Sequence, residues 1–173
     1  GMGGREVRKG IDHGEIFDHH FVEFKYPSGA IVSSQCRHQP GTKYDVSEAF
    51  QGTKANLVTS GDYCKIIDHN GNDVFKHDPS NDKSPYQIEH DRLFESIRSG
   101  GVINNAEYGA KSTLTAIMGR MATYTGKEIT WEQALNSQQV LVPNDLSWNS
   151  NPPTLPDSNG RYTIPKPGET KVI

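Results

Sequence analysis

Residues 104–137 read NNAEYGAKSTLTAIMGRMATYTGKEITWEQALNS and decide most of the expected fold. We predict a helix that starts at Asn104 or Asn105 and ends at Gly126, because glycine readily takes the left-handed conformation that stops a helix. A short helix should follow, with Thr130 as its N-cap and Gln133 completing a capping box. The long helix is predicted to turn inward the side chains of Tyr108, Leu114, Ile117, Met118 and Met121.

An earlier helix is predicted over residues 85–99, which read PYQIEHDRLFESIRS. Ser84 can accept a hydrogen bond from the backbone of Gln87, Pro85 suits the first helical position, and Gly100 provides the stop. We interpret His90 as a core histidine on the buried stripe of this helix. The predicted stripe consists of Tyr86, His90, Leu93, Phe94 and Ile97.

The segment from residue 4 to about 77 has an apolar period of two, which is typical of strands with one face in water. Val22, Phe24 and Tyr26 share one face, and the turn over 26–29, Tyr-Pro-Ser-Gly, predicts a β-hairpin. Four to six antiparallel strands are expected, with REVRKG at 5–10 also resembling a strand. The later strands are predicted in YDVSEAF (44–50), ANLVTS (55–60) and a hairpin in YCKIIDHNGNDVF (63–75) that turns at Asn70–Gly71.

After Ser137 the composition changes, because six prolines interrupt any regular element. We therefore predict an α+β domain over 1–137 and a Pro-rich extended tail over 138–173 that packs on it. The domain should have two layers, an open, mostly antiparallel sheet with helices on one face. Its second face should bury against another protein surface. The expected anchors of the tail are Trp148, Leu155, Tyr162 and Ile164.

The charge balance argues against a nucleic-acid partner. The chain has 18 Lys and Arg against 21 Asp and Glu, and its basic residues form no long run. Mean hydropathy is -0.70, and no apolar run reaches the roughly 18 residues of a membrane span, so we expect a water-soluble protein without a membrane partner. Gly1 stands ahead of Met2 and no signal-peptide pattern follows, so the start leaves open a cytoplasmic or periplasmic location. Cys36 and Cys64 are expected to be buried or half-buried free thiols.

The densest group of metal-ligand side chains is DHGEIFDHH, residues 12–20. Imidazole and carboxylate together suit zinc or iron, but the spacing matches no zinc motif, and His19 and His20 would point to opposite faces of a strand. A polar loop that enters the first hairpin strand is the favoured interpretation. No glycine-rich nucleotide fingerprint and no G-x-S-x-G nucleophile motif occurs.

Residues 36–43, CRHQPGTK, leave a strand with three basic side chains, Arg37, His38 and Lys43. Such a group could present cations and hydrogen-bond donors to an anionic or polyol ligand. A solvated strand end is the competing interpretation.

Five stretches together resemble the C-terminal domain of the glucose-fructose oxidoreductase, inositol dehydrogenase and MocA (Gfo/Idh/MocA) family. The resemblance runs from about residue 3 to 150. It implies an open, mostly antiparallel sheet with helices on one face, whose other face commonly forms the subunit interface. The stretches are GREVRKG, DHHFVEFKYPSGAIVSSQCRHQPG, SEAFQGTK, SPYQIEHDRLFESIRSG and residues 104–137.

Full members of that family resemble two-domain NAD(P)-dependent dehydrogenases that act on sugars or polyols. Their Rossmann domain, Glu-Lys-Pro lysine and Asp/His helix have no counterpart here, so the resemblance implies no catalytic residue and no cofactor in this chain. NAD or NADP is expected for a full-length protein, and the expected partners are the missing Rossmann domain and further copies of the chain. The implied substrate-binding candidates are Arg37, His38 and Lys43, with His19 and His20 behind them.

Three functions follow as hypotheses. The first is the substrate-binding and oligomerisation domain of such an oxidoreductase, inactive alone. The second is a stand-alone dimeric binding or scaffold protein derived from that domain. The third is a metal-dependent hydrolase built on residues 12–20.

Overall fold

The computed structural model describes residues 1–61 and 63–172, and the chain forms two compact units. One unit combines Gly1–Gly41 with Asn105–Ile173, and the other consists of Thr42–Asn104. Antiparallel sheet and helices are both present, as predicted. The strands belong to two sheets instead of one. The first sheet ends with the strand that finishes at Arg37, and the next strand, which begins at Glu48, belongs to a separate sheet. The predicted boundary after residue 137 stays a prediction.

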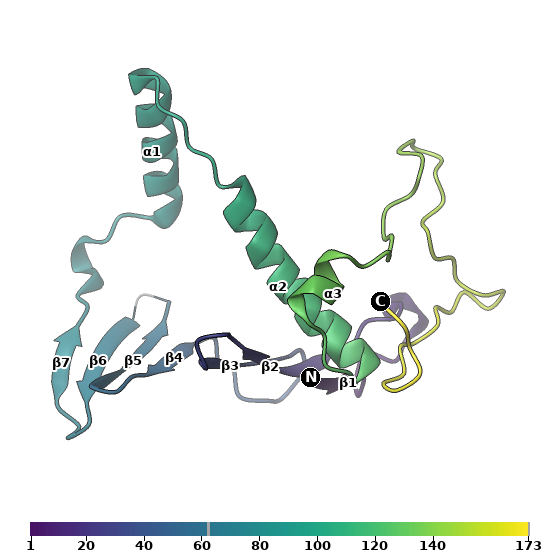
Figure 1. The fold of residues 1–173 in the computed structure, drawn as a ribbon, viewed down its shortest axis with the longest axis horizontal. Helices are drawn as coiled ribbons and strands as arrows, with labels where there is room; N and C mark the ends of the chain where they lie inside the picture. The colour runs from purple at the N-terminus through teal and green to yellow at the C-terminus, as the bar shows by residue number, and fades with distance from the viewer. Residues whose placement is uncertain (62, 173) are drawn as a thin grey trace. The chain divides into compact units, whose positions relative to one another are not determined.

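The sheet of the first unit has three antiparallel strands in the order β1 (Met2–Gly4), β2 (His19–Lys25) and β3 (Ile31–Arg37) (Figure 1). The predicted hairpin is confirmed. The Gly29 N–H donates to the Tyr26 carbonyl at 2.9 Å, with Gly29 at φ 88°. The strand expected over residues 5–10 is wrong, since these residues form a loop that leads to a short 3₁₀ helix, η1 (Ile11–His13).

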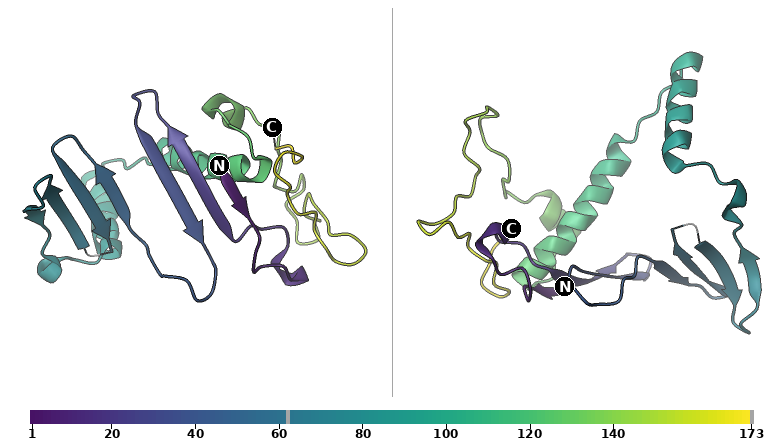
Figure 2. Two further views of the ribbon diagram at one scale, coloured as in Figure 1. Left: turned by 90° about the horizontal axis from the view of Figure 1, so that it is seen from below. Right: turned by 180° about the vertical axis from the view of Figure 1, so that it is seen from behind.

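Helix α2 (Ala106–Thr125) lies across one face of this sheet and contacts β1, β2 and α3 (Trp131–Leu135) (Figures 1 and 2). The approach is close at Gly119, where a Cβ atom would lie 3.2 Å from the Phe24 ring. The predicted end of α2 at Gly126 and the predicted start of α3 at Thr130 are both confirmed. The N–H of Gly126, at φ 69°, donates to the Ala122 carbonyl, and Thr130 and Gln133 form the capping box. The buried apolar cluster consists of Met121, Ala122, Ile129, Ala134 and Val172, with Leu114 and Met118 packed against it.

The inward face predicted for α2 is right for three of its five residues. Leu114, Met118 and Met121 pack inward, whereas Tyr108 is 76% exposed and Ile117 is 38% exposed. Tyr108 is exposed because the cluster and the sheet cover the C-terminal turns of the helix, and the N-terminal turns extend beyond them.

The segment after residue 137 belongs to the first unit, but its predicted anchors are largely wrong. Trp148 and Leu155 are exposed, and Ile164 is 38% exposed, whereas Tyr162 is half-buried. Val172 holds the segment instead. Its side chain joins the apolar cluster, and its carbonyl accepts a 2.9 Å hydrogen bond from the Ser137 hydroxyl.

The second unit has four antiparallel strands in the order β4 (Glu48–Gln51), β5 (Ala55–Ser60), β6 (Tyr63–Asp68) and β7 (Asp73–Lys76). Strand β5 matches its predicted range, whereas β4 covers only the end of YDVSEAF. The predicted hairpin between β6 and β7 is confirmed, with Gly71 at φ 88° and its N–H 3.1 Å from the Asp68 carbonyl. The seven described strands exceed the four to six expected, because β1 was not foreseen.

A one-turn 3₁₀ helix, η2 (Pro79–Asn81), precedes α1 (Pro85–Ser99), which ends at Gly100 as predicted. Ser84 makes no side-chain cap at the start of this described helix, and the side-chain amide of Gln87 donates to Asp91 at 2.7 Å. Every residue of α1 is exposed or half-buried, so its stripe does not pack on a sheet as expected. His90 is exposed with Nδ1 2.7 Å from the Tyr86 carbonyl, and its interpretation as a core residue is wrong.

Cys36 is exposed and Cys64 is half-buried, so the prediction of a buried or half-buried thiol is confirmed for Cys64 and wrong for Cys36. The exposure of Cys36 follows from its place in β3, whose residues are exposed throughout. Among the described helices, we find none whose length and apolar content would let it cross a bilayer.

Candidate functional site

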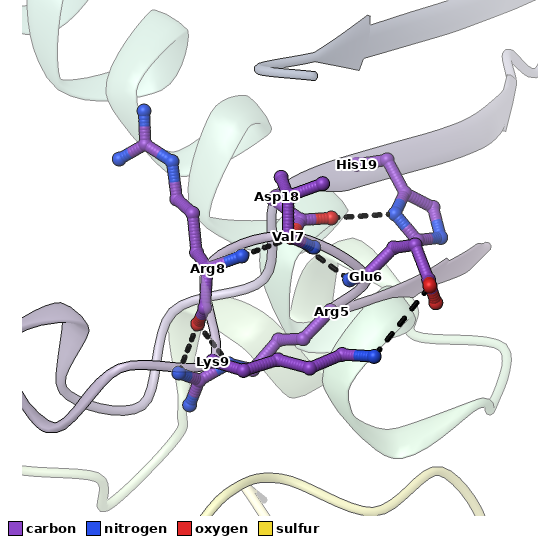
Figure 3. A network of polar contacts seen from close by, with 7 residues as sticks. All are labelled: Arg5, Glu6, Val7, Arg8, Lys9, Asp18 and His19. Carbon is purple, nitrogen blue, oxygen red and sulfur yellow. Dashed lines mark hydrogen bonds and ion pairs between the residues drawn. The ribbon is translucent and has the colours of Figure 1, made fainter. Parts of the chain in front are cut away.

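The candidate site is built on Asp18, which directly precedes β2 and is 2% exposed. Its Oδ2 atom accepts hydrogen bonds from the backbone N–H groups of Glu6, Val7 and Arg8 at 2.8, 2.7 and 2.9 Å (Figure 3). Successive backbone N–H groups that converge in this way form a concave anion-binding nest. The Asp18 carboxylate fills the nest and thereby fixes the loop that follows β1.

These hydrogen bonds determine the ionisation of Asp18. Burial by itself would raise the pKa of its carboxyl group, because burial disfavours the charged form. The donors from the backbone of Arg8, the ring of His19 and the backbone of Val7 and Glu6 outweigh burial, and they hold the pKa well below its usual range. Asp18 is therefore a carboxylate at neutral pH and can only accept hydrogen bonds.

His19 is oriented by the other oxygen of Asp18. Its Nδ1 atom lies 2.8 Å from Asp18 Oδ1, and its side chain is 41% exposed (Figure 3). Because the carboxylate can only accept, Nδ1 carries the hydrogen, and Nε2 of the neutral ring is left as an acceptor. The ring lies against Gly4, where a Cβ atom would be 3.3 Å from Nε2, so a larger residue at this position would crowd that nitrogen.

Arg37 lies beside His19, because the two residues are register partners across β2 and β3. Side chains at directly opposed positions of an antiparallel pair share a face, with Cβ atoms about 4.5–5.5 Å apart. His38 follows at the end of β3, and its N–H donates to the Asp18 carbonyl at 2.8 Å. One end of the hairpin thus gathers an oriented imidazole, an exposed guanidinium and a second exposed imidazole. Here we call Asp18, His19, Arg37 and His38 the hairpin-end cluster.

His20 points to the opposite face of the sheet, as predicted, and contacts α2. Its Nδ1 atom lies 3.0 Å from the hydroxyl of Thr123, and its ring stacks on Tyr124 with centroids 6.3 Å apart. Burial, and secondarily repulsion from a protonated His19, lower the pKa of His20, while Asp18 raises it by a smaller amount. His20 therefore belongs to the packing between sheet and helix rather than to the exposed cluster.

Lys43 belongs to the second unit, where its Nζ atom lies 2.7 Å from Asp45. The acidic and histidine segment 12–20 is divided. His13 lies near Asp12, His19 pairs with Asp18, and His20 faces α2. Among the described residues, no three His, Cys, Asp or Glu side chains gather as metal ligands would.

The two best-defined depressions in the described part of the chain measure about 90 and about 80 Å³. Enclosed pockets for drug-sized ligands commonly measure about 300–1,000 Å³. The hairpin-end cluster lines neither of these two depressions, and its Arg37 and His38 are exposed while His19 is half-buried.

Comparison of the chain with protein-family models, curated proteins and solved structures found no match.

The sequence analysis did not identify Asp18 as the residue that fixes the loop after β1. Asp18 stood out only as one carboxylate of a possible metal group, whereas it is the anion that fixes a loop and orients His19. The adjacency of Asp18 and His19 was visible, but the three donors are backbone N–H groups, which every residue type except proline provides.

Proposed function

We propose that this chain is the substrate-binding and oligomerisation domain of an NAD(P)-dependent oxidoreductase that acts on a sugar or polyol. The resemblance over residues 3–150 suggests the class, and the hairpin-end cluster is the observation that carries the proposal. Nε2 of His19 accepts a hydrogen bond, and the guanidinium of Arg37 donates several. A vicinal pair of hydroxyl groups offers the matching donor and acceptors.

The cofactor and the hydride-transfer groups would come from another domain, and NAD or NADP would bind there. In this proposal His19 and Arg37 bind substrate hydroxyl groups, and His38 lies at the same end of the hairpin. Asp18 does not touch substrate. It holds His19 in the tautomer whose Nε2 atom is an acceptor.

Binding is tested by titrating the isotopically labelled chain with myo-inositol, sorbitol and glucose and following the imidazole and Arg side-chain NMR signals. The proposal predicts saturable shifts at His19 and Arg37 that the variants His19→Gln and Arg37→Gln weaken. His90→Gln is the matched control, because His90 is an exposed histidine of the other unit. Shifts that are absent, or equal in His19→Gln and the control, would overturn the assignment of the site.

The two-domain part of the proposal is tested separately, by the mass of the native protein in a source-cell lysate detected with antibody to this chain. A band larger by about 100–200 residues, the size of one domain, is expected. The native protein of that mass, purified from the same cells, should then oxidise polyols with NAD or NADP. A band at 19.2 kDa would favour the stand-alone dimeric binding protein instead.

Self-association is supported by an apolar row across the four-stranded sheet of the second unit. Phe50, Leu57, Ile66 and Phe75 are successive register partners and therefore share one face. Phe50 is 61% exposed and Phe75 is 47% exposed. We propose that a second copy of the chain covers this row, because exposed apolar surface of this kind commonly marks interfaces.

Light scattering during size-exclusion chromatography tests this part. Phe50→Lys should lower the molar mass of the eluted species toward that of one chain, because it places a charge in the covered surface. Tyr63→Lys is the control, since Tyr63 is 44% exposed on the opposite face of β6. Equal masses for the original chain and Phe50→Lys would contradict the proposed interface.

A further inference from the structure

A second basic site lies apart from the hairpin-end cluster, where the loop after β1 meets the C-terminal segment. Arg5 and Lys9 from the loop, and Arg161 and Tyr162 from the segment, line a depression of about 80 Å³. All of them belong to the first unit. None of the described residues that line it is acidic, and three of them carry a positive charge.

The guanidinium of Arg5 is immobilised without being neutralised. Its Nε atom donates to the Arg8 carbonyl and its Nη1 atom to the Gly14 carbonyl, both at 2.7 Å, and Nη2 also donates to Arg8. These acceptors are uncharged, so the positive charge has no carboxylate partner among these bonds. Three of the five N–H donors of an arginine are used, which leaves two for a ligand.

The loop that carries Arg5 and Lys9 is fixed in advance. The hydrogen bonds from Glu6, Val7 and Arg8 to Asp18 lie between the two cations in sequence and set the path of the loop (Figure 3). A site held in this way loses little conformational freedom when a ligand binds, which favours affinity.

Arg161 is positioned by a turn of its own. Its backbone N–H donates to the Asp157 carboxylate at 2.8 Å, and its backbone carbonyl accepts from the Asp157 backbone N–H at 2.9 Å. Lys9 lies 3.5 Å from Glu6, but both side chains are more than 60% exposed, so this ion pair is weak and a stronger anion can displace it. The turn and the loop together hold two cations from distant parts of the chain at one place.

We propose that this depression binds a phosphoryl oxyanion, either inorganic phosphate or the phosphate group of an ester. Arginine matches phosphate oxygens with paired N–H donors, and lysine adds a point charge. The depression is small, about 80 Å³, and open to solvent, so a tetrahedral oxyanion can enter it directly. Binding would relieve the mutual repulsion of the three cations.

Isothermal titration calorimetry of the whole chain with inorganic phosphate, in a phosphate-free buffer, tests the proposal. Ionic strength should be held near 0.1 M, because screening acts over about 10 Å there. We expect saturable binding with a stoichiometry of one. Arg161→Gln and Lys9→Gln should each weaken it about fivefold or more, which corresponds to ~1 kcal/mol.

Arg92→Gln on α1 is the matched control, because it removes the same charge from an exposed position of the other unit. Circular dichroism shows whether each variant keeps its fold. Binding that does not saturate, or that Arg92→Gln weakens as much as Arg161→Gln does, overturns the proposal, since the effect would then come from net charge.

A second titration, with glucose 6-phosphate and with glucose, identifies the source of the anion. If the ester binds at least as tightly as inorganic phosphate and glucose does not bind, the site takes a phosphorylated ligand whose remainder stays outside the depression. If inorganic phosphate alone binds, the site takes the free ion. If glucose binds as well as its phosphate, the oxyanion assignment is wrong.

Discussion

His20 and Thr123, 103 residues apart in sequence, are joined by a 3.0 Å hydrogen bond between Nδ1 and Oγ1 that ties β2 to α2. The Thr123 hydroxyl donates its hydrogen to the Arg120 carbonyl at 3.0 Å, so it must accept from His20. Nδ1 of His20 therefore carries a hydrogen, and a further proton would add to Nε2 of a ring that contacts those of Phe17 and Tyr124.

This arrangement predicts that acid weakens the packing of the first unit. The pKa of His20 is lowered by burial and by His19, so the folded state disfavours the protonated ring. Its stabilising contribution is complete above the unfolded pKa of about 6.5 and is lost as the pH falls through 6.5 toward the folded value. Urea unfolding of the original chain at several pH values should show this loss, and His20→Gln should show a smaller one. If His69→Gln, at an exposed loop position, flattens the profile as much, His20 is not the group responsible.

Replacing Asp18 should destabilise the chain strongly. Asp18→Ala leaves three converging N–H groups without their acceptor, and hydrogen bonds to charged groups contribute about 1.5–3 kcal/mol each. We expect a loss of about 3–5 kcal/mol in the free energy of unfolding, with a smaller loss for Asp18→Asn, which keeps one acceptor oxygen. Asp12→Ala is the control, because its carboxylate is 77% exposed, and it should cost less than about 0.5 kcal/mol. Equal losses at the two positions would refute the role assigned to Asp18.

Asp18 also predicts a second acid transition, at lower pH. Because its folded pKa is depressed, the stabilisation is complete above the unfolded value of about 3.9 and is lost as the pH falls below that value. The protection of the Glu6, Val7 and Arg8 amides against exchange should fall across this range, because the opened loop takes up a proton that the folded carboxylate does not. Protection that stays constant down to pH 2 would contradict the nest.

Two glycines with the same backbone conformation separate strain from packing. Gly126 and Gly100 both have φ 69°, but a Cβ atom at Gly126 would lie 2.9 Å from Pro167, whereas at Gly100 nothing lies within 4 Å. Gly100→Ala should cost only the left-handed strain, roughly 1–2 kcal/mol locally. Gly126→Ala should cost a further ~1–3 kcal/mol by overpacking. Thermal unfolding of the two variants and the original chain would measure both losses of stability. Equal losses would show that Pro167 moves aside without cost.

The capping box of α3 allows a similar paired test. Thr130→Ala removes the 3.1 Å hydrogen bond from the Gln133 N–H and should cost about 1 kcal/mol. Ser84→Ala, at the start of α1, should cost much less, because the Ser84 side chain makes no cap hydrogen bond in this described helix. Chemical denaturation monitored by far-UV circular dichroism gives both values, and a larger effect at Ser84 would mean that its hydroxyl caps α1 in solution.

The features predicted correctly from sequence are those that a few neighbouring residues specify. Gly126 ends α2 and Thr130 begins α3 because the required conformation or hydrogen bond lies within one helical turn. The same holds for the turn at Gly29. The failures concern partners, since the apolar stripe of α1 indicates which face should be buried but not what buries it. His90 and Trp148 were assigned to buried positions for that reason, and both are exposed.

The candidate site shows the same division. The alternation of side chains along β2 placed His19 and His20 on opposite faces, and pairing of the hairpin then brought His19 and Arg37 together. The nest around Asp18 could not be predicted, because its donors come from the backbone of a loop that was expected to be a strand. Arg161 was not foreseen beside Arg5 and Lys9, since its approach depends on the path of a segment without regular structure.

The contact between Ser137 and Val172 closes residues 138–171 into a loop whose two ends are held at one place. Most of residues 144–159 are exposed, which makes them accessible to proteases. A single cut there would not release the C-terminal piece, because Val172 stays buried beside Met121 and the Gly168 N–H donates to the Thr125 carbonyl at 2.7 Å. The nicked protein would elute as one particle and separate into two fragments only on denaturation.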